Sequence, residues 1–213
     1  MSRCLLLGFA LSAVACGGAG VLPSISIAAR RGDIAWMRQL LDAGADPNEP
    51  ARDGNGWPPL MHAIHKGQFE AAALLLEHGA DPNGAGPAGY TALMMAAADS
   101  DSRMVRLLLD HGADPHRRGP GGMTALSQAV TGGALGDIDR PLLGGCHADT
   151  VRALLEFEPD LTLPSSAAGA EARFWAHLHA GLQKMWNVAT VRTTGARPVT
   201  DCGAVLNAAR RRP

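Results

Sequence analysis

Apolar residues recur at helical spacing in several segments of the chain. One segment carries Phe69, Ala72, Leu75 and Leu76, and the next carries Met104, Leu107 and Leu108. A double leucine also returns four times, as Leu40-Leu41, Leu75-Leu76, Leu108-Leu109 and Leu154-Leu155. Spacings of three and four residues predict amphipathic helices that each turn one apolar face toward a core.

Two short phrases repeat in fixed phase with these helices. The first ends each unit: Asp42-Ala43-Gly44-Ala45-Asp46-Pro47-Asn48, Glu77-His78-Gly79-Ala80-Asp81-Pro82-Asn83 and Asp110-His111-Gly112-Ala113-Asp114-Pro115-His116. The second opens each unit: Pro58-Pro59-Leu60-Met61, Thr91-Ala92-Leu93-Met94 and Thr124-Ala125-Leu126-Ser127. Its leucines are 33 residues apart both times. A fixed period of this length predicts a stack of repeated structural units.

Local signals indicate where the helices of one unit begin and end. Thr91 and Thr124 can cap a short first helix, whose small residues allow close approach of its neighbours. A turn is expected at Gly32, Gly67 or Ser100, before the second helix. That helix is expected to stop at a glycine in the left-handed conformation. These terminating glycines are Gly44, Gly79 and Gly112.

On these phrases the chain resembles the ankyrin repeat family. The resemblance implies an all-α solenoid of about four helix–turn–helix units, curved around a concave face, with a helical C-terminal cap. We expect units at 24–53, 54–86, 87–119 and 120–163, followed by the cap and tail at 164–213. The histidine of the family's opening phrase is replaced by Met61, Met94 and Ser127. Its hydrogen-bond bracing is therefore expected to be absent.

The fourth unit is longer than the others. Asp114 and Asp160 are 46 residues apart, 13 more than the usual 33, and the extra residues are assigned to an insertion at 134–146. Insertions in solenoids emerge as loops on one face, often the binding face. Tolerated lengthening of a loop is the alternative, because it costs little entropy.

Beyond Ser165 the period ends. Residues 171–189 predict an amphipathic helix, and Thr200 or Asp201 can cap a last short helix with Val205 and Leu206. Because the end of a solenoid must be sealed, we interpret this tail as a cap. The alternative is a partner-binding helix that uses Phe174, Trp175 and Trp186.

The first residues resemble an export signal. An apolar run after Arg3 is too short to span a bilayer, and the small residues before Cys16 fit cleavage after Ala15. The boundary resembles a bacterial lipobox, which implies a signal peptide at 1–15, lipidation of Cys16 and a linker at 16–23. Gly17 in the next position favours the outer membrane. Ordinary cleavage, giving a soluble periplasmic or secreted protein, is the alternative.

Export also bears on the remaining thiols, Cys146 and Cys202. In an oxidising compartment two leftover cysteines tend to pair, so we expect a disulfide between them. Two unpaired thiols are the alternative.

Composition and motifs give little support to catalysis. The formal net charge is −1, which predicts no nucleic-acid binding, and aromatic residues make up only 4% of the chain. No metal-ligand or catalytic spacing occurs, so we expect no enzyme activity, no cofactor and no metal. A metal-binding or enzymatic role for Cys146-His147 and the insertion is the competing hypothesis.

The sequence therefore predicts a monomeric, lipid-anchored periplasmic module that binds another protein. It resembles small exported proteins that serve in stress protection or in immunity to an effector. A secreted effector that acts on a host protein is the alternative. The expected partner-binding residues lie at loop tips and at the ends of first helices: Arg30, Arg31, Arg52, Asn55, Trp57, His65, Lys66, Tyr90, Asp99, Arg117 and Arg118.

Overall fold

The computed structural model describes residues 24–51, 55–87, 89–131, 147–165, 169, 170, 173 and 202–209. The predicted signal peptide, Cys16, the linker, Arg52, the insertion at 134–146 and Cys146 lie outside the described residues. So does most of the predicted helix at 171–189, with Phe174, Trp175 and Trp186.

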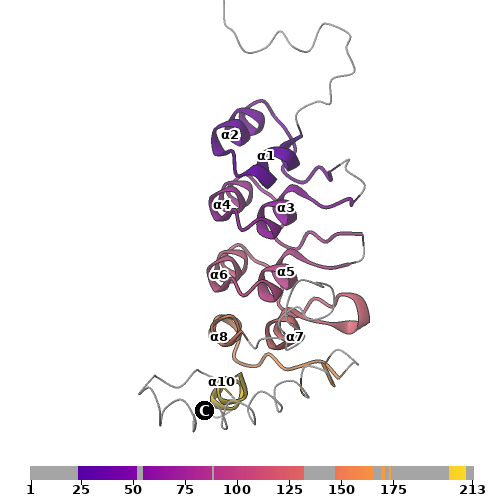
Figure 1. The fold of residues 1–213 in the computed structure, drawn as a ribbon, viewed down its shortest axis with the longest axis vertical. Helices are drawn as coiled ribbons and strands as arrows, with labels where there is room; N and C mark the ends of the chain where they lie inside the picture. Colours follow the sequence, from indigo (N-terminus) through magenta and orange to yellow (C-terminus); the bar gives the residue numbers. More distant parts are fainter. Residues whose placement is uncertain are drawn as a thin grey trace, which may run out of the picture.

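Four helix pairs, here called units 1 to 4, stack along the long axis of the molecule (Figure 1). The first helices form one column and the second helices a parallel column beside it. The first helices are α1 (Ile25–Arg31), α3 (Pro59–His65), α5 (Ala92–Ala98) and α7 (Ala125–Thr131). The second helices are α2 (Ile34–Asp42), α4 (Phe69–Glu77), α6 (Ser102–Asp110) and α8 (Ala148–Phe157). This arrangement confirms the predicted all-α solenoid.

Between units the chain runs out from the first helices on the side away from the second helices (Figure 1). We call these segments the outer loops. One antiparallel bridge, between Ala85 and Thr91, lies in the second of them. The third contains a short 3-10 helix, η1 (Pro120–Gly122).

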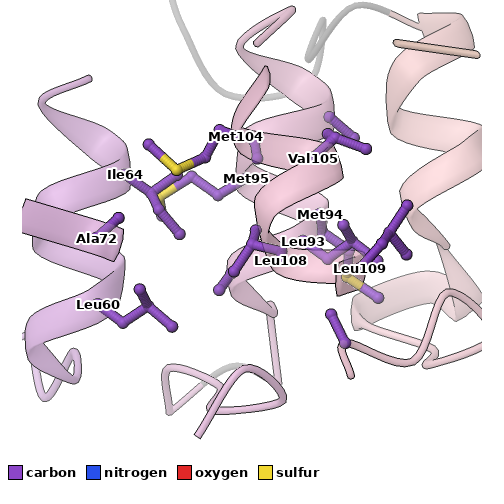
Figure 2. Close-up of a cluster of buried hydrophobic side chains, with 14 of the residues drawn as sticks. Leu60, Ile64, Ala72, Leu93, Met94, Met95, Met104, Val105, Leu108 and Leu109 are labelled. Carbon is purple, nitrogen blue, oxygen red and sulfur yellow. The ribbon is translucent and has the colours of Figure 1, made fainter. Parts of the chain in front are cut away.

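The core is continuous from unit to unit. Leu60, Leu93 and Leu126 hold equivalent places on α3, α5 and α7, and their exposed fractions are 1%, 2% and 1%. Figure 2 shows the side chains of Met95 and Met104 pointing toward Ile64 of the preceding unit. The repeated leucine therefore marks the buried column that the sequence predicts.

The structure confirms the predicted residues at which the helices begin and end. The Thr91 hydroxyl accepts a hydrogen bond from the Met94 N–H at 3.2 Å and so caps α5. Gly79 follows the last residues of α4 with a φ of 85°, a conformation that costs glycine little. Ser100 is the one non-glycine residue with positive φ in the part of the chain that the structure describes, and its φ is 65°.

One prediction about bracing is wrong for unit 4. The Ser127 hydroxyl accepts from the Thr124 N–H and donates to the Thr124 carbonyl oxygen, both at 2.8 Å. The Ser127 N–H also donates to the Thr124 hydroxyl at 3.3 Å. A serine thus takes the place of the family's histidine and stabilises the start of α7 through hydrogen bonds to Thr124, three residues earlier. Met61 and Met94 hold the same position in the preceding units and are buried.

Asparagine side chains tie consecutive units together. Asn48 Nδ2 donates to the Gly79 carbonyl oxygen at 3.1 Å, and its Oδ1 accepts from the Asp81 N–H at 2.7 Å. Asn83 repeats both contacts with Gly112 and Asp114, at 3.0 and 2.8 Å. At the last junction His116 replaces asparagine, and its Nε2 lies 2.9 Å from Glu158 Oε1. These contacts fix the register of one unit on the next.

The residues that flank the insertion keep the geometry of an ordinary unit. In unit 3 the Asp101 N–H donates to the Ala96 carbonyl oxygen at 3.2 Å. In unit 4 the His147 N–H donates to Ala129 at 2.9 Å, and α8 begins at Ala148. The extra residues of unit 4 therefore fall between α7 and α8, and the helices on either side of them keep the geometry of the other units.

Helix α10 (Cys202–Ala209) packs against α8 at the end of the stack (Figure 1). Val205 and Leu206 are partly buried against the core, and Cys202 is buried and disulfide-bonded. The other three cysteines lie outside the described residues, so the pairing of Cys202 with Cys146 stays a prediction. Among the helices of the described ranges, none has the length and apolar content needed to cross a bilayer.

Candidate interaction surface

The expected partner-binding residues separate into two groups at opposite ends of the first helices. One group lies where α1, α3 and α5 end, at the turn into the second helix. It consists of Arg30, Arg31, His65, Lys66 and Asp99, all exposed, and we call it the turn edge. The other group lies in the outer loops, which enter the first helices at their N-terminal ends. It consists of Asn55, Trp57, Tyr90, Arg117 and Arg118.

The turn edge has a fixed register because each turn has the same backbone structure. Gly32, Gly67 and Ser100 occupy its left-handed position, with φ of 68°, 65° and 65°. The residues just before them are therefore equivalent in the three units: Arg31, Lys66 and Asp99, preceded by Arg30, His65 and Ala98. The first helices are in contact from α1 to α7, so these equivalent positions follow one another along the stack.

The charge of the turn edge changes sign along this row. Units 1 and 2 present the cations Arg30, Arg31 and Lys66, whereas unit 3 presents Asp99. Within the described ranges, none of the three cations is in an ion pair. Two arginines of the second helices, Arg106 and Arg152, pair with Glu156 and Asp149 at 2.8 and 2.7 Å. The turn edge thus carries positive charge that the fold leaves accessible.

Trp57 connects the first outer loop to the turn edge. Its ring centre lies 5.4 Å from that of His65 in an edge-to-face arrangement, and 5.6 Å from that of His62. A β-carbon built on Gly86 would lie 3.0 Å from the Trp57 ring, so a larger residue there would push the ring aside by a few tenths of an ångström. Trp57 is half-buried and packs between loops, while its contact with His65 extends toward the exposed end of α3.

Tyr90 holds the position of Trp57 in the next unit. Its hydroxyl donates to the Met94 carbonyl oxygen at 3.3 Å. Burial, and secondarily the Asp99 carboxylate, raise the pKa of the Tyr90 phenol above its ordinary value. Tyr90 therefore keeps its proton at neutral pH and serves mainly to brace α5.

Asn55 and Arg117 make hydrogen bonds that lie within the outer loops and do not involve turn-edge residues. Asn55 Oδ1 accepts from the Trp57 N–H at 3.0 Å, which shapes the base of the first loop. Arg117 Nη2 donates to the Asn83 carbonyl oxygen at 3.3 Å, and Arg118 is exposed beside it. These two arginines form a separate basic site in the third outer loop.

His62 contacts the Trp57 ring although it was not among the expected partner-binding residues. Its side chain is 3% exposed and stands between the Trp57 ring and the core. The spacing of His62 and His65, one helical turn apart, is the signal that could have pointed to it. In the portion of the chain that the structure describes, no three His, Cys, Asp or Glu side chains gather as metal ligands would.

Comparison with protein families agrees with this geometry. The family model for ankyrin repeats, which represents three copies, matches residues 25–119 and again residues 83–164. The two matches together cover all four helix pairs and 140 of the 213 residues. They end before α10.

Several curated proteins are similar over part of the stack. Cyclin-dependent kinase 4 inhibitor B of Rattus norvegicus is 45% identical over 74 residues, which are 35% of this chain and 55% of that protein. An ankyrin repeat-containing protein of Treponema pallidum (strain Nichols) is 38% identical over 83 residues, 39% of this chain and 28% of that protein. The 2-5A-dependent ribonuclease of Mus musculus is 44% identical over 69 residues, 30% of this chain and 9% of that protein. The chain thus spans less than two thirds of each relative, and the ribonuclease match bears on the repeats alone.

Proposed function

Because the chain belongs to the ankyrin repeat family, we propose that it is a protein-binding module whose partner lies against the first helices and the outer loops. The first helices are buried along most of their length. α1 and α3 expose side chains mainly at their C-terminal ends, and the residue that follows α5 is also exposed. The outer loops carry further side chains that stacking does not use, and the second helices also expose residues such as Arg38 and Gln39. One relative, an inhibitor of cyclin-dependent kinase 4 by its name, is a protein that acts on another protein.

One observation carries this proposal: the row of equivalent turn-edge positions, beside which the Trp57 ring lies against His65 of unit 2. Aromatic and arginine side chains supply most of the binding free energy in protein interfaces. Here they occur together on a rigid column of helices. A rigid surface binds with little loss of conformational entropy, which favours specific association.

Affinity capture tests the binding function. The full chain is immobilised and incubated with an extract of the source cells that includes the periplasmic fraction. Variants His65→Ala/Lys66→Ala and Arg117→Ala/Arg118→Ala probe the two ends of the proposed surface, and Arg38→Ala/Gln39→Ala on α2 is the control. We expect at least one of the first two variants to lose a captured protein about tenfold, while the control retains it. Loss in the control alone would place the partner on the second helices.

The proposed setting is the bacterial periplasm, where a lipid on Cys16 holds a monomeric module at the outer membrane. The support is the sequence pattern at the N-terminus, and the proposed roles are stress protection or immunity to an effector. Labelling cells with radioactive palmitate tests the anchor. Label is expected on the wild-type chain and absent from Cys16→Ala, with Cys4→Ala as the matched control. Equal labelling of wild type and Cys16→Ala contradicts the anchor, and an unlabelled protein in the medium favours the secreted effector.

A further inference from the structure

Helix dipoles account for the positive part of the turn edge but not for its negative residue. A cation at a helix C-terminus is stabilised by the helix dipole, which accounts for Arg30 and Arg31 on α1. Asp99 occupies the same place on α5, where the dipole disfavours a negative charge. The dipole therefore favours the cations of units 1 and 2 and does not account for the charge in unit 3.

Carboxylates close to the turn edge are engaged elsewhere. Asp33 Oδ1 accepts from the Trp36 N–H at 3.0 Å and caps α2. Asp101 Oδ1 accepts from the N–H groups of Arg103 and Met104, at 3.1 and 2.9 Å, and caps α6. Both side chains point at helix N-termini, where negative charge is favoured. They do not form ion pairs with Arg30, Arg31 or Lys66, which leaves these cations available to an anionic ligand.

The spacing of the row fits an extended peptide. Packed helices lie about 8–10 Å apart, so equivalent residues of units 1 and 2 have about this separation. A polyproline II segment rises about 3.1 Å per residue and has three residues per turn. Its side chains i and i+3 therefore lie on one side, about 9 Å apart. Carboxylates at these positions can face Arg31 and Lys66 together.

We propose that the turn edge of units 1 and 2 binds an acidic, extended segment of the partner protein. Acidic side chains three residues apart contact Arg31 and Lys66, with Arg30 and His65 beside them and the Trp57 ring at the edge of the site. This inference rests on the proposed protein-binding function.

A synthetic peptide provides the probe. The isotope-labelled full chain is titrated with a twelve-residue peptide of four Glu-Pro-Pro repeats, and backbone amide shifts are followed by NMR. We expect saturable shifts at residues 30–32 and 65–67 and none on α2 or α6. A rise in salt from about 0.05 to 0.3 M weakens binding several-fold, because exposed charges are screened. The Gln-Pro-Pro peptide leaves the spectrum unchanged.

Charge reversal separates this site from general anion binding. Arg31→Glu/Lys66→Glu is expected to weaken peptide binding at least tenfold, since two attractions become repulsions. Arg38→Glu/Arg103→Glu changes the net charge equally on the second helices and is expected to leave binding within twofold. Unchanged binding in the first variant, absence of shifts, or shifts confined to Arg117 and Arg118 overturns the proposal. Equal binding of a twelve-nucleotide oligothymidylate or of phosphatidylglycerol vesicles at residues 30–32 and 65–67 also overturns it.

The two proposals fail in distinguishable ways. If affinity capture finds a partner whose binding is insensitive to Arg31→Glu/Lys66→Glu, the protein-binding function stands and the acidic-segment inference falls. If capture yields no saturable partner, the binding function itself falls. Circular dichroism of each variant before titration verifies that the reversed charges leave the helices intact.

Discussion

Replacement of Leu108 by alanine is expected to lower the free energy of unfolding by about 3–5 kcal/mol. Leu108 lies on α6 with no exposed surface, and α6 packs against α5 in its own unit and α8 in the next. Deleting its side chain removes buried apolar contacts and leaves a cavity between helices that neighbours on both sides hold apart. Urea unfolding followed by circular dichroism at 222 nm measures the loss.

Leu107→Ala is the matched control on the same helix. Leu107 is only partly buried, so the same substitution is expected to cost about 1 kcal/mol. Because each unit of a solenoid is stabilised by its neighbours, loss at Leu108 should reach units 2 and 4 as well as unit 3. Equal costs for the two substitutions would show that the interior of unit 3 is not packed as the structure has it.

The fold could be predicted because local and long-range signals agree in every unit. Thr91 caps the helix that the repeated leucine predicts, and Gly79 ends the helix that the double leucine predicts. Each unit alone buries too little apolar surface to be stable, so the stack follows from the repeat itself. The fourth unit obeys the same logic, since α8 begins at Ala148 after the longer connection.

Contacts that depend on the exact path of the chain were not predicted from the sequence. The hydrogen bonds between Ser127 and Thr124 form at the start of α7, although the replacement of histidine by serine predicted that bracing is lost there. The approach of the second loop to the Trp57 ring depends on how units 2 and 3 stack. The asparagine contacts between units could have been predicted, because Asn48 and Asn83 recur at one place in the repeated phrase.

The candidate surface was predicted as a set of residues without its geometry. Lys66 and Arg117 were predicted from the sequence as members of one set of binding residues. The structure separates them, because Lys66 lies at the turn edge and Arg117 in an outer loop. The order of charge along Arg31, Lys66 and Asp99 becomes visible only when the left-handed turn positions set the register. Helix boundaries within one residue decide that register, and pattern analysis does not locate them so closely.

Replacement of Cys202 by alanine is expected to lower the free energy of unfolding by about 2–4 kcal/mol under oxidising conditions. Cys202 is buried and disulfide-bonded at the start of α10, which packs against α8. If Cys146 is its partner, the bond closes a span of 56 residues and restricts the unfolded chain accordingly. Thermal unfolding of wild type and variant, each with and without dithiothreitol, measures the effect.

The identity of the partner cysteine follows from three further variants. Cys146→Ala is expected to cost about as much as Cys202→Ala, and the double variant is expected to cost little more than either alone, because both substitutions remove the same bond. Cys16→Ala is expected to leave the unfolding temperature unchanged. A loss of stability in Cys16→Ala, or an unaffected Cys146→Ala, would contradict the predicted pairing. It would also mean that the disulfide of α10 ties the end of the stack to the N-terminal segment instead of to the connection between α7 and α8.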